Sequence, residues 1–236
     1  MRSRLASVLR PPVLERRCLA HSKGTGLLTT MLGDFSGSPY FAITSTFRDA
    51  RVPVANKVNY LGATTDGYSQ GKSLSDNGVK AVVSAAISSG RLPKNPNAVY
   101  FVLTSRDVSE TSGFLTRYCG WHSHATISTF DIKYAFVGDP STGLAACSAQ
   151  PVGPNGAVYA GADAMASVVA HELEETVSDP DLNAWYDASG AENADKCAWT
   201  YGVAVSSGTS NMTLGGTRFL IQQNWNATTQ GCALTA

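Results

Sequence analysis

The sequence predicts an α+β fold in a single domain. Segments with strand patterns come both before and after segments with helix patterns, they do not alternate strictly, and neither a linker nor an internal repeat divides the chain. With 43% apolar residues among 236, the chain can bury a substantial core. It lacks the low hydrophobicity and high net charge that are typical of disordered proteins.

Residues 1–33 are expected to be an atypical leader, which leaves 34–236 as the domain. Residues 1–23 carry six Lys or Arg and one acid, but the apolar run at 5–9 is too short for a secretory signal and two prolines follow it. The leader is interpreted either as a mitochondrial presequence or as a misplaced start that replaces a signal peptide.

The first two elements are expected to be a short strand and an amphipathic helix. Residues 52–60 alternate in part between apolar and polar, which favours the strand. The helix is expected at about 75–89, because apolar residues recur there three and four positions apart. Ser75 can cap its first turn, and Gly90 and Pro93 end it.

The middle of the chain is expected to form the centre of the sheet. Residues 99–103 are an unbroken apolar run between turn residues, which is typical of a strand buried on both faces. Residues 134–137 have the pattern of another strand. Residues 139–161, rich in Pro, Gly, Ala and Ser, are expected to be a loop.

A second helix is expected at about 163–178, with Asp163 as its N-cap. Val169, Leu173 and Val177 recur every four positions along it, so they form one stripe that should face the core. Beyond this helix, residues 184–198 have a hairpin-like pattern around a Ser-Gly turn, and a late strand is expected at 219–225.

The cysteines favour disulfide bonds. Five are present, and setting aside Cys18 of the leader leaves an even four, none of them in a CxxC pair. This pattern favours two disulfides over a zinc knuckle, although buried reduced thiols are the alternative and three pairings are possible. The four are Cys119, Cys147, Cys197 and Cys232.

Composition excludes two classes of partner. The 18 Lys and Arg balance 18 acids without a basic stripe, which argues against a nucleic-acid partner, and no apolar run approaches the ~18 residues of a membrane span. Charged residues make up only 15% of the chain, which favours a secreted or wall-associated protein. If the chain is exported, Asn211 and Asn226 are predicted glycosylation sites.

The helix at 163–178 carries the clearest chemical signal. His171 and Glu175 are four residues apart, so they lie one turn apart on one face, and imidazole and carboxylate are both ordinary zinc ligands. Glu172 would project beside the metal, where the glutamate of an HExxH helix acts as general base. The pattern predicts an HExxE zinc site with Glu172 as a catalytic residue.

Such a site needs at least a third ligand. Glu192 and Asp195, downstream of the helix, are the predicted candidates, and Asp181 is an alternative at a spacing found in some zinc peptidases. His122 and His124 alternate along an extended segment, so they point the same way, and either can complete the site or act as an electrophile.

Two other interpretations use the same acids. His171 can simply offset the carboxylates of a solvated helix face. A calcium loop is the other interpretation, although Ala184 and Gly190 stand where an EF-hand needs Gly and Glu. Its four ligand positions would be Asp179, Asp181, Asn183 and Asp187.

Six motifs connect the chain to a known family. They occur in this order: Val99-Tyr-Phe-Val-Leu-Thr-Ser105, Cys119-Gly-Trp-His122, Tyr134-Ala-Phe-Val-Gly138, His171-Glu-Leu-Glu-Glu175, Asn183-Ala-Trp-Tyr186 and Glu192-Asn-Ala-Asp-Lys-Cys197. Over about residues 34–236 the chain resembles the EXORDIUM / phosphate-induced protein 1 family of secreted plant, fungal and oomycete proteins. The sequences of these motifs are most similar to those of the fungal branch of the family.

The resemblance implies an extracellular or cell-wall protein, associated in plants with growth responses. It also implies a single zincin-like domain with a mixed sheet, a backing helix and an HExxE active-site helix. Related fungal sequences carry two further cysteines that are absent here, near Leu115 and near Gly143 or Leu144, which implies the pairs Cys119–Cys147 and Cys197–Cys232. The site residues carried over by motif are His122, His171, Glu172, Glu175, Glu192 and Asp195.

Two function hypotheses follow. The first is a secreted, monomeric zinc-dependent hydrolase, peptidase-like, acting on a peptide or cell-wall substrate. In it, His171 and Glu175 bind the metal, Glu192 or Asp195 is the third ligand, and Glu172 activates water. The second is a non-catalytic extracellular protein in which the same cluster holds structural zinc or calcium, or pairs charges.

Overall fold

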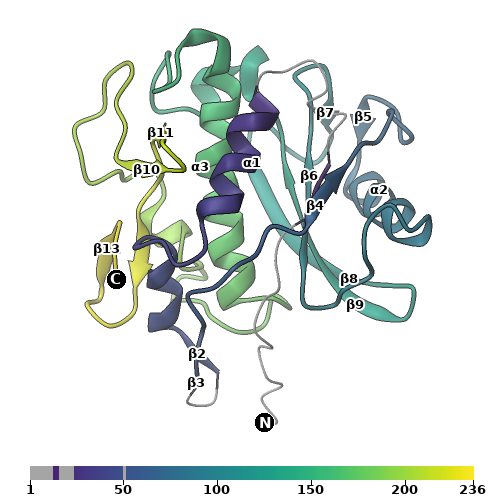
Figure 1. Ribbon diagram of the computed structural model, residues 1–236, viewed down its shortest axis with the longest axis horizontal. Coiled ribbons are helices and arrows are strands. Elements are labelled where there is room, and N and C mark those ends of the chain that lie inside the picture. The colour runs from purple at the N-terminus through teal and green to yellow at the C-terminus, as the bar shows by residue number, and fades with distance from the viewer. Residues whose placement is uncertain (1–12, 16–23, 50–51) are drawn as a thin grey trace.

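The computed structural model describes residues 13–15, 24–49 and 52–236 (Figure 1). Its longer helices are α1 (Gly24–Asp34), α2 (Asp76–Ser88) and α3 (Ala160–Ser178). Short 3-10 turns are η1 (Phe41–Thr46), η2 (Pro140–Thr142), η3 (Leu144–Ala146), η4 (Ala157–Tyr159) and η5 (Asp195–Cys197). The strands are β1 (Val13–Glu15), β2 (Arg48–Asp49), β3 (Val52–Pro53), β4 (Gly62–Thr64), β5 (Ser73–Leu74), β6 (Val99–Leu103), β7 (Ser109–Glu110), β8 (Gly120–Ile127), β9 (Phe130–Val137), β10 (Met212–Leu214), β11 (Thr217–Phe219), β12 (Asn224–Asn226) and β13 (Gly231–Ala233).

The main sheet is mixed and has five strands in the order β4-β1-β6-β9-β8. The first four are parallel, and β8 pairs antiparallel with β9 through a tight turn. The predictions of a mixed sheet and of an α+β fold are confirmed. Strand β8 lies at one edge of this sheet, which matters for the site.

Helices cover both faces of the sheet. Figure 1 shows α1 and α3 on one side and α2 on the other. Successive residues of β6 point to opposite faces. Phe101 therefore packs with α1 and α3, whereas Tyr100 packs with α2, and the whole strand is buried as predicted.

The two predicted helices are confirmed with small shifts. Ser75 caps α2 by accepting from the backbone N–H of Gly78 at 3.2 Å. Helix α3 begins at Ala160, so Asp163 is not the cap; its carboxylate instead accepts from Asn155 at 2.7 Å. The predicted stripe at positions 169, 173 and 177 is buried in the core.

The predicted boundary at residue 34 is wrong for part of the leader. Residues 24–34 form α1, and Leu28, Met31 and Leu32 have no exposed surface because they pack in the same core as α3. Strand β1 also belongs to the sheet. The rest of the leader, including Cys18, lies outside the described residues.

Three expected strand segments differ from the structure. Only Val52–Pro53 of the predicted 52–60 strand is a strand. No strand forms within 184–198, because the Asp187 side chain bonds the turn backbone and η5 follows. The predicted 219–225 strand is split between the ends of β11 and β12.

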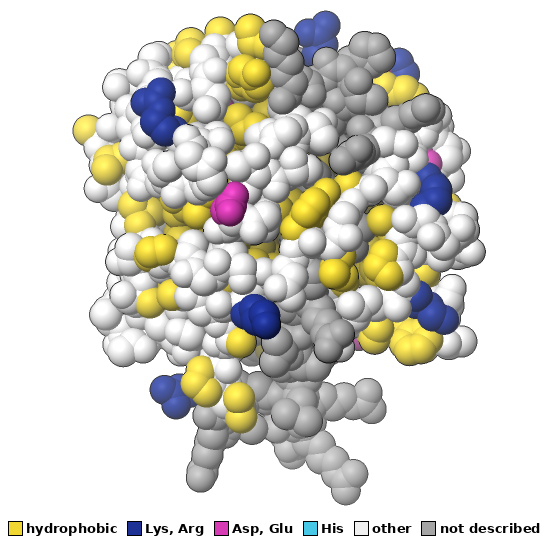
Figure 2. Space-filling view, viewed as in Figure 1, with side chains coloured by type: hydrophobic (Ala, Val, Ile, Leu, Met, Phe, Trp, Pro, Cys, Tyr) yellow, Lys and Arg dark blue, Asp and Glu magenta, His cyan; other side chains and the backbone are white. Residues whose placement is uncertain are grey.

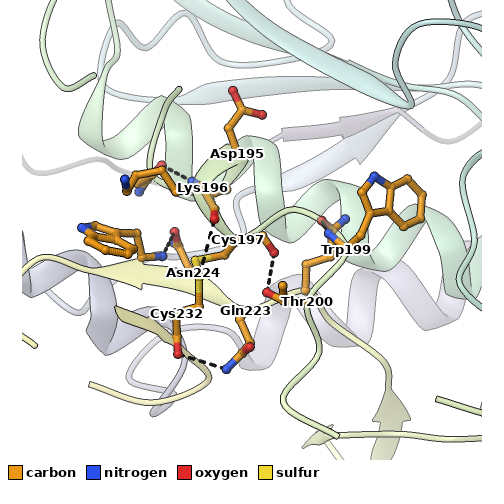
Figure 3. Close-up of a disulfide and its surroundings, with 12 residues drawn as sticks. Asp195, Lys196, Cys197, Trp199, Thr200, Gln223, Asn224 and Cys232 are labelled. Atoms are coloured by element: carbon orange, nitrogen blue, oxygen red, sulfur yellow. Dashed lines mark hydrogen bonds between the residues drawn. A yellow bond between two sulfur atoms is a disulfide. The ribbon is translucent and has the colours of Figure 1, made fainter. Parts of the chain in front are cut away.

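Both expected disulfides are present. Cys119 pairs with Cys147 and Cys197 with Cys232, with Cα–Cα distances of 5.5 and 5.6 Å (Figure 3 shows the second). The first ties the start of β8 to the segment after η3, and the second ties η5 to β13. Leu115 Cδ1 would lie 3.2 Å from a Cβ on Gly143, so the two positions of the absent bridge are neighbours.

The folded structure does not support the two predicted glycosylation sites. The Nδ2 group of Asn211 donates to the carbonyls of Tyr201 and Ile221, at 2.9 and 2.7 Å. Asn226 is 2% exposed. A glycan on either amide would break these bonds or need buried space. On the face in Figure 2, charged side chains are sparse and apolar ones are scattered among neutral polar atoms.

Gly120→Ala is expected to destabilise the protein by about 1–3 kcal/mol, because the new methyl group overpacks a rigid contact. A Cβ there would lie 2.6 Å from Val168 Cγ1 and 2.8 Å from the Phe136 carbonyl oxygen. Gly33→Ala, in α1 with open space around it, is the control and should leave stability unchanged or slightly raised. Urea unfolding measures both; equal curves for the two variants would contradict the close approach of β8 and α3.

Candidate functional site

A cavity of about 610 Å³ lies where β8 passes α3. Residues 115–122 form one wall, the side chains of α3 form the floor, and the segment 192–199 forms another wall. All six residues that the sequence analysis carried over as site residues line it: His122, His171, Glu172, Glu175, Glu192 and Asp195.

On α3, His171 and Glu175 lie one turn apart, as their spacing predicts. His171 Nε2 is 3.0 Å from Glu175 Oε1 and 3.4 Å from Asp195 Oδ1. The backbone N–H of Asp195 donates to Glu175 Oε1 at 3.1 Å. The segment 192–195 therefore meets the helix at the Glu175 carboxylate.

His122 projects from β8 into the same cluster. Its Nε2 is 3.2 Å from both carboxylate oxygens of Glu192. Ligand atoms of His122, Glu175 and Glu192 lie within 4.8 Å of one another, and so do those of His171, Glu172 and Glu175. Because Glu175 belongs to both groups, the two groups form one continuous cluster.

The cluster holds four carboxylates and two imidazoles, and its negative charge is poorly solvated. Burial and the charge of Glu175 raise the pKa of Glu172 to about 8, and burial raises the pKa of Glu192. Burial alone would lower the pKa of His171, but Glu175 and Asp195 outweigh it and hold that pKa well above its usual value. A divalent cation would neutralise this excess of buried negative charge.

The donor set fits a divalent metal ion. The ligand atoms of a tetrahedral zinc lie roughly 3.3 Å apart, because its bonds are about 2.0–2.1 Å long. The His171–Glu175 and His122–Glu192 distances of 3.0 and 3.2 Å are close to that value. The Nδ1 atoms of both histidines are buried and have no hydrogen-bond partner among the described residues, so the polar contacts of both rings are made through Nε2.

Buried polar side chains hold the segment 192–195 against α3. Asn193 has no exposed surface, and its Nδ2 donates to the backbone carbonyl of Glu174 at 3.2 Å. The Glu174 carboxylate, equally buried, accepts from Asn224 Nδ2 at 2.6 Å, and burial raises the pKa of Glu174 well above its usual value. The bond from Asn193 to the helix backbone places Glu192 and Asp195 at the cavity.

His124 and Asp181 lie outside the cluster. Lys133 Nζ is 2.5 Å from the carboxylates of both Asp131 and Asp181, and His124 Nδ1 is 2.9 Å from Asp131. This separate group already contains its own cation. The alternatives that used Asp181 or His124 to complete the site are therefore wrong.

The loop 179–190 is not arranged as a calcium site. The Asp179 carboxylate accepts the backbone N–H of Asn183 at 2.7 Å. Asp187 accepts backbone N–H groups of its own turn and pairs with Lys196 at 2.9 Å. Because these acids bond to the backbone and to lysines, they do not converge on one point.

Sequence reasoning missed several residues at the cavity. Arg117, Trp199 and Gln222 line it, and only folding brings their segments together. Asn193 could have been identified from the sequence, because it lies between two predicted ligands in the motif 192–197. Its anchoring role still depends on a helix carbonyl that sequence spacing does not reveal.

Comparison with known proteins supports the family resemblance. "Protein EXORDIUM-like 5" of Arabidopsis thaliana is 31% identical over 216 residues, covering 76% of this chain and 59% of the relative. "Protein EXORDIUM-like 3" of the same plant is 30% identical over 198 residues, covering 70% and 58%. The chain thus spans about six-tenths of the length of these relatives. No solved structure matches it.

Among the described residues, no helix has both the length and the apolar character needed to cross a bilayer. The model of the family described as "Phosphate-induced protein 1 conserved region" matches residues 34–235, which is most of the chain. With the two EXORDIUM-like relatives, this match shows that the chain belongs to the phosphate-induced protein 1 family.

Proposed function

We propose that the chain is a metal-dependent hydrolase, with zinc as its metal. The observation that supports this is the convergence of two imidazoles and four carboxylates in one cavity, joined through the shared carboxylate of Glu175. Zinc, when bound, polarises a substrate carbonyl and lowers the pKa of a water molecule. A peptidase-like reaction at a carbonyl, in a peptide or in an acylated cell-wall substrate, and a zincin-like fold are part of this proposal.

Each residue of the cluster has a role in the proposal. His171 and Glu175 hold the metal from α3, and Glu192 completes the set from the downstream segment. His122, which the sequence offered as a ligand or an electrophile, takes the electrophile's role from β8 beside Glu192, so that the metal has three protein ligands and an open position. Asp195, whose Oδ1 lies 3.4 Å from the same His171 Nε2, is the alternative third ligand.

Glu172 is the proposed general base. It lies on the same helix, lines the cavity and is 4% exposed. Its carboxylate accepts the proton of the attacking water and then passes it to the leaving group.

An oxidising compartment is proposed for the protein. Two disulfides tie the borders of the cavity, and such bonds persist mainly outside the reducing cytosol. An extracellular or cell-wall location fits this chemistry, and a place in the fungal branch of the family belongs to the same proposal. A mitochondrial location is the alternative.

A non-catalytic role is the second candidate. Adding His122 to His171, Glu175 and Glu192 gives four protein ligands, which is the number that closes a structural zinc site. In this alternative the cluster holds zinc or calcium to brace α3 against β8, and Glu172 only pairs charges.

Metal analysis of the purified, oxidised protein tests the centre first. We expect about one equivalent of zinc, and a lower melting temperature after chelation, because metal binding is coupled to folding. His171→Ala should lose the metal, whereas His124→Ala, in the separate ion-paired group, should keep it. Calcium in place of zinc would favour the structural candidate, and a chelator-insensitive, metal-free protein would refute both.

A further inference from the structure

Trp199 is an exposed aromatic side chain at the cavity. It follows the Cys197–Cys232 disulfide by two residues, is 51% exposed and lines the cavity. Figure 3 shows its indole projecting away from the disulfide. Because it is half exposed beside a polar cavity, this ring offers a flat apolar surface on which a ligand can pack.

The backbone of Trp199 is held in a strained conformation. Trp199 has φ +63°, a left-handed conformation that costs a bulky residue about 1–3 kcal/mol. The backbone N–H of Trp199 donates to Gln222 Oε1 at 2.8 Å, and Thr200 Oγ1 donates to the Cys197 carbonyl at 2.6 Å. Strain of this kind persists only where the surroundings enforce it, and it is concentrated at ligand-binding positions.

The rest of the cavity limits the ligand that this ring can meet. Glu172 and Asp195 offer hydrogen-bond acceptors and disfavour an anion, whereas Arg117 offers hydrogen-bond donors. Arg117 makes no ion pair within 4.0 Å among the described residues, so its donors are open to a ligand. A neutral ligand with a flat apolar face and hydroxyl groups around its edge satisfies all these groups at once.

We propose that Trp199 is the platform of a subsite for a neutral sugar ring, so that the cavity takes an oligosaccharide. The apolar face of the ring packs on the indole, and its hydroxyl groups bond with the carboxylates and Arg117. The choice of saccharide as substrate class rests on the proposed function. The stacking contact itself does not need the metal.

Oligosaccharide binding with and without chelator tests the subsite. The probes are neutral β-linked glucose, xylose and N-acetylglucosamine hexamers, with a neutral Gly/Ser/Leu hexapeptide as the competing class, measured by calorimetry and tryptophan fluorescence. We expect at least one hexamer to bind and Trp199→Ala to weaken binding by about tenfold or more, which is about 1.4 kcal/mol. Trp199→Phe should restore part of the affinity, because it keeps a flat ring.

Phe130→Ala is the matched control, since Phe130 is 39% exposed but does not line the cavity. It should bind as the unchanged protein does. Binding that is lost in Trp199→Ala but kept in chelator supports the subsite even where the hydrolase proposal fails. Failure of every hexamer to bind, equal binding by Trp199→Ala, or binding of the hexapeptide alone would overturn it.

Discussion

Glu172→Gln is expected to lower kcat by about 10²–10⁴-fold while zinc content and fold stay unchanged. The amide keeps the size of the side chain but cannot accept the proton of the attacking water. Among the described residues, the Glu172 carboxylate makes no hydrogen bond that holds α3 in place, and its Oε1 faces Gly120, where a Cβ would lie 3.0 Å from it. Turnover is measured with zinc-loaded protein on pooled fluorogenic peptides and acylated oligosaccharides.

The matched control for this variant is Glu174→Gln, the same exchange two residues along the same helix. Glu174 is fully buried, does not line the cavity and bonds to Asn224. It should leave kcat unchanged. Equal turnover by Glu172→Gln and the unchanged protein would remove Glu172 from the mechanism, and equal losses in both variants would indicate a general effect on the helix.

Asn193→Ala is expected to weaken zinc binding by about 10–100-fold, as loss of a residue that orients ligands typically does. The change frees the segment 192–195 from the carbonyl of Glu174, so Glu192 and Asp195 no longer hold their positions. It also leaves the buried backbone N–H of Ala194 without its acceptor, which costs roughly 1–3 kcal/mol of stability. Chelator competition measures the affinity and urea unfolding the stability.

A variant of similar stability loss separates these two effects. Val83→Ala truncates a side chain that is 3% exposed on α2, across the sheet from the cavity, and should cost roughly 2 kcal/mol. We expect it to bind zinc normally. If Val83→Ala and Asn193→Ala lose affinity equally, the loss reflects stability alone and Asn193 has no positioning role.

Periodicity predicted the elements whose burial is regular. Helix α2, strand β6 and helix α3 each bury a repeating set of side chains, so 3.6-residue and continuous apolar patterns located them. Helix α1 was missed because the charges before it indicated a leader, although Leu28 and Met31 are fully buried. The hairpin expected at 184–198 failed because the Asp187 side chain takes the place of ladder bonds.

The candidate site was predictable to the extent that its residues lie on one helix. The four-residue spacing placed His171 and Glu175 together, and motif order brought in Glu192. The contact of His122 with Glu192 joins positions 70 residues apart, so only the packing of β8 against α3 creates it. The same is true of Arg117 and Trp199, which no local pattern connects to the helix.

The two disulfides have a practical consequence for anyone preparing this protein. Cys119 directly precedes β8, and Cys197 ends η5 beside the cavity, so both bridges brace its rim rather than the centre of the core. Bacterial expression in a reducing cytoplasm would therefore leave these cysteines reduced and remove both covalent restraints from the rim. Refolding with a glutathione couple, checked by counting free thiols, should precede any assay.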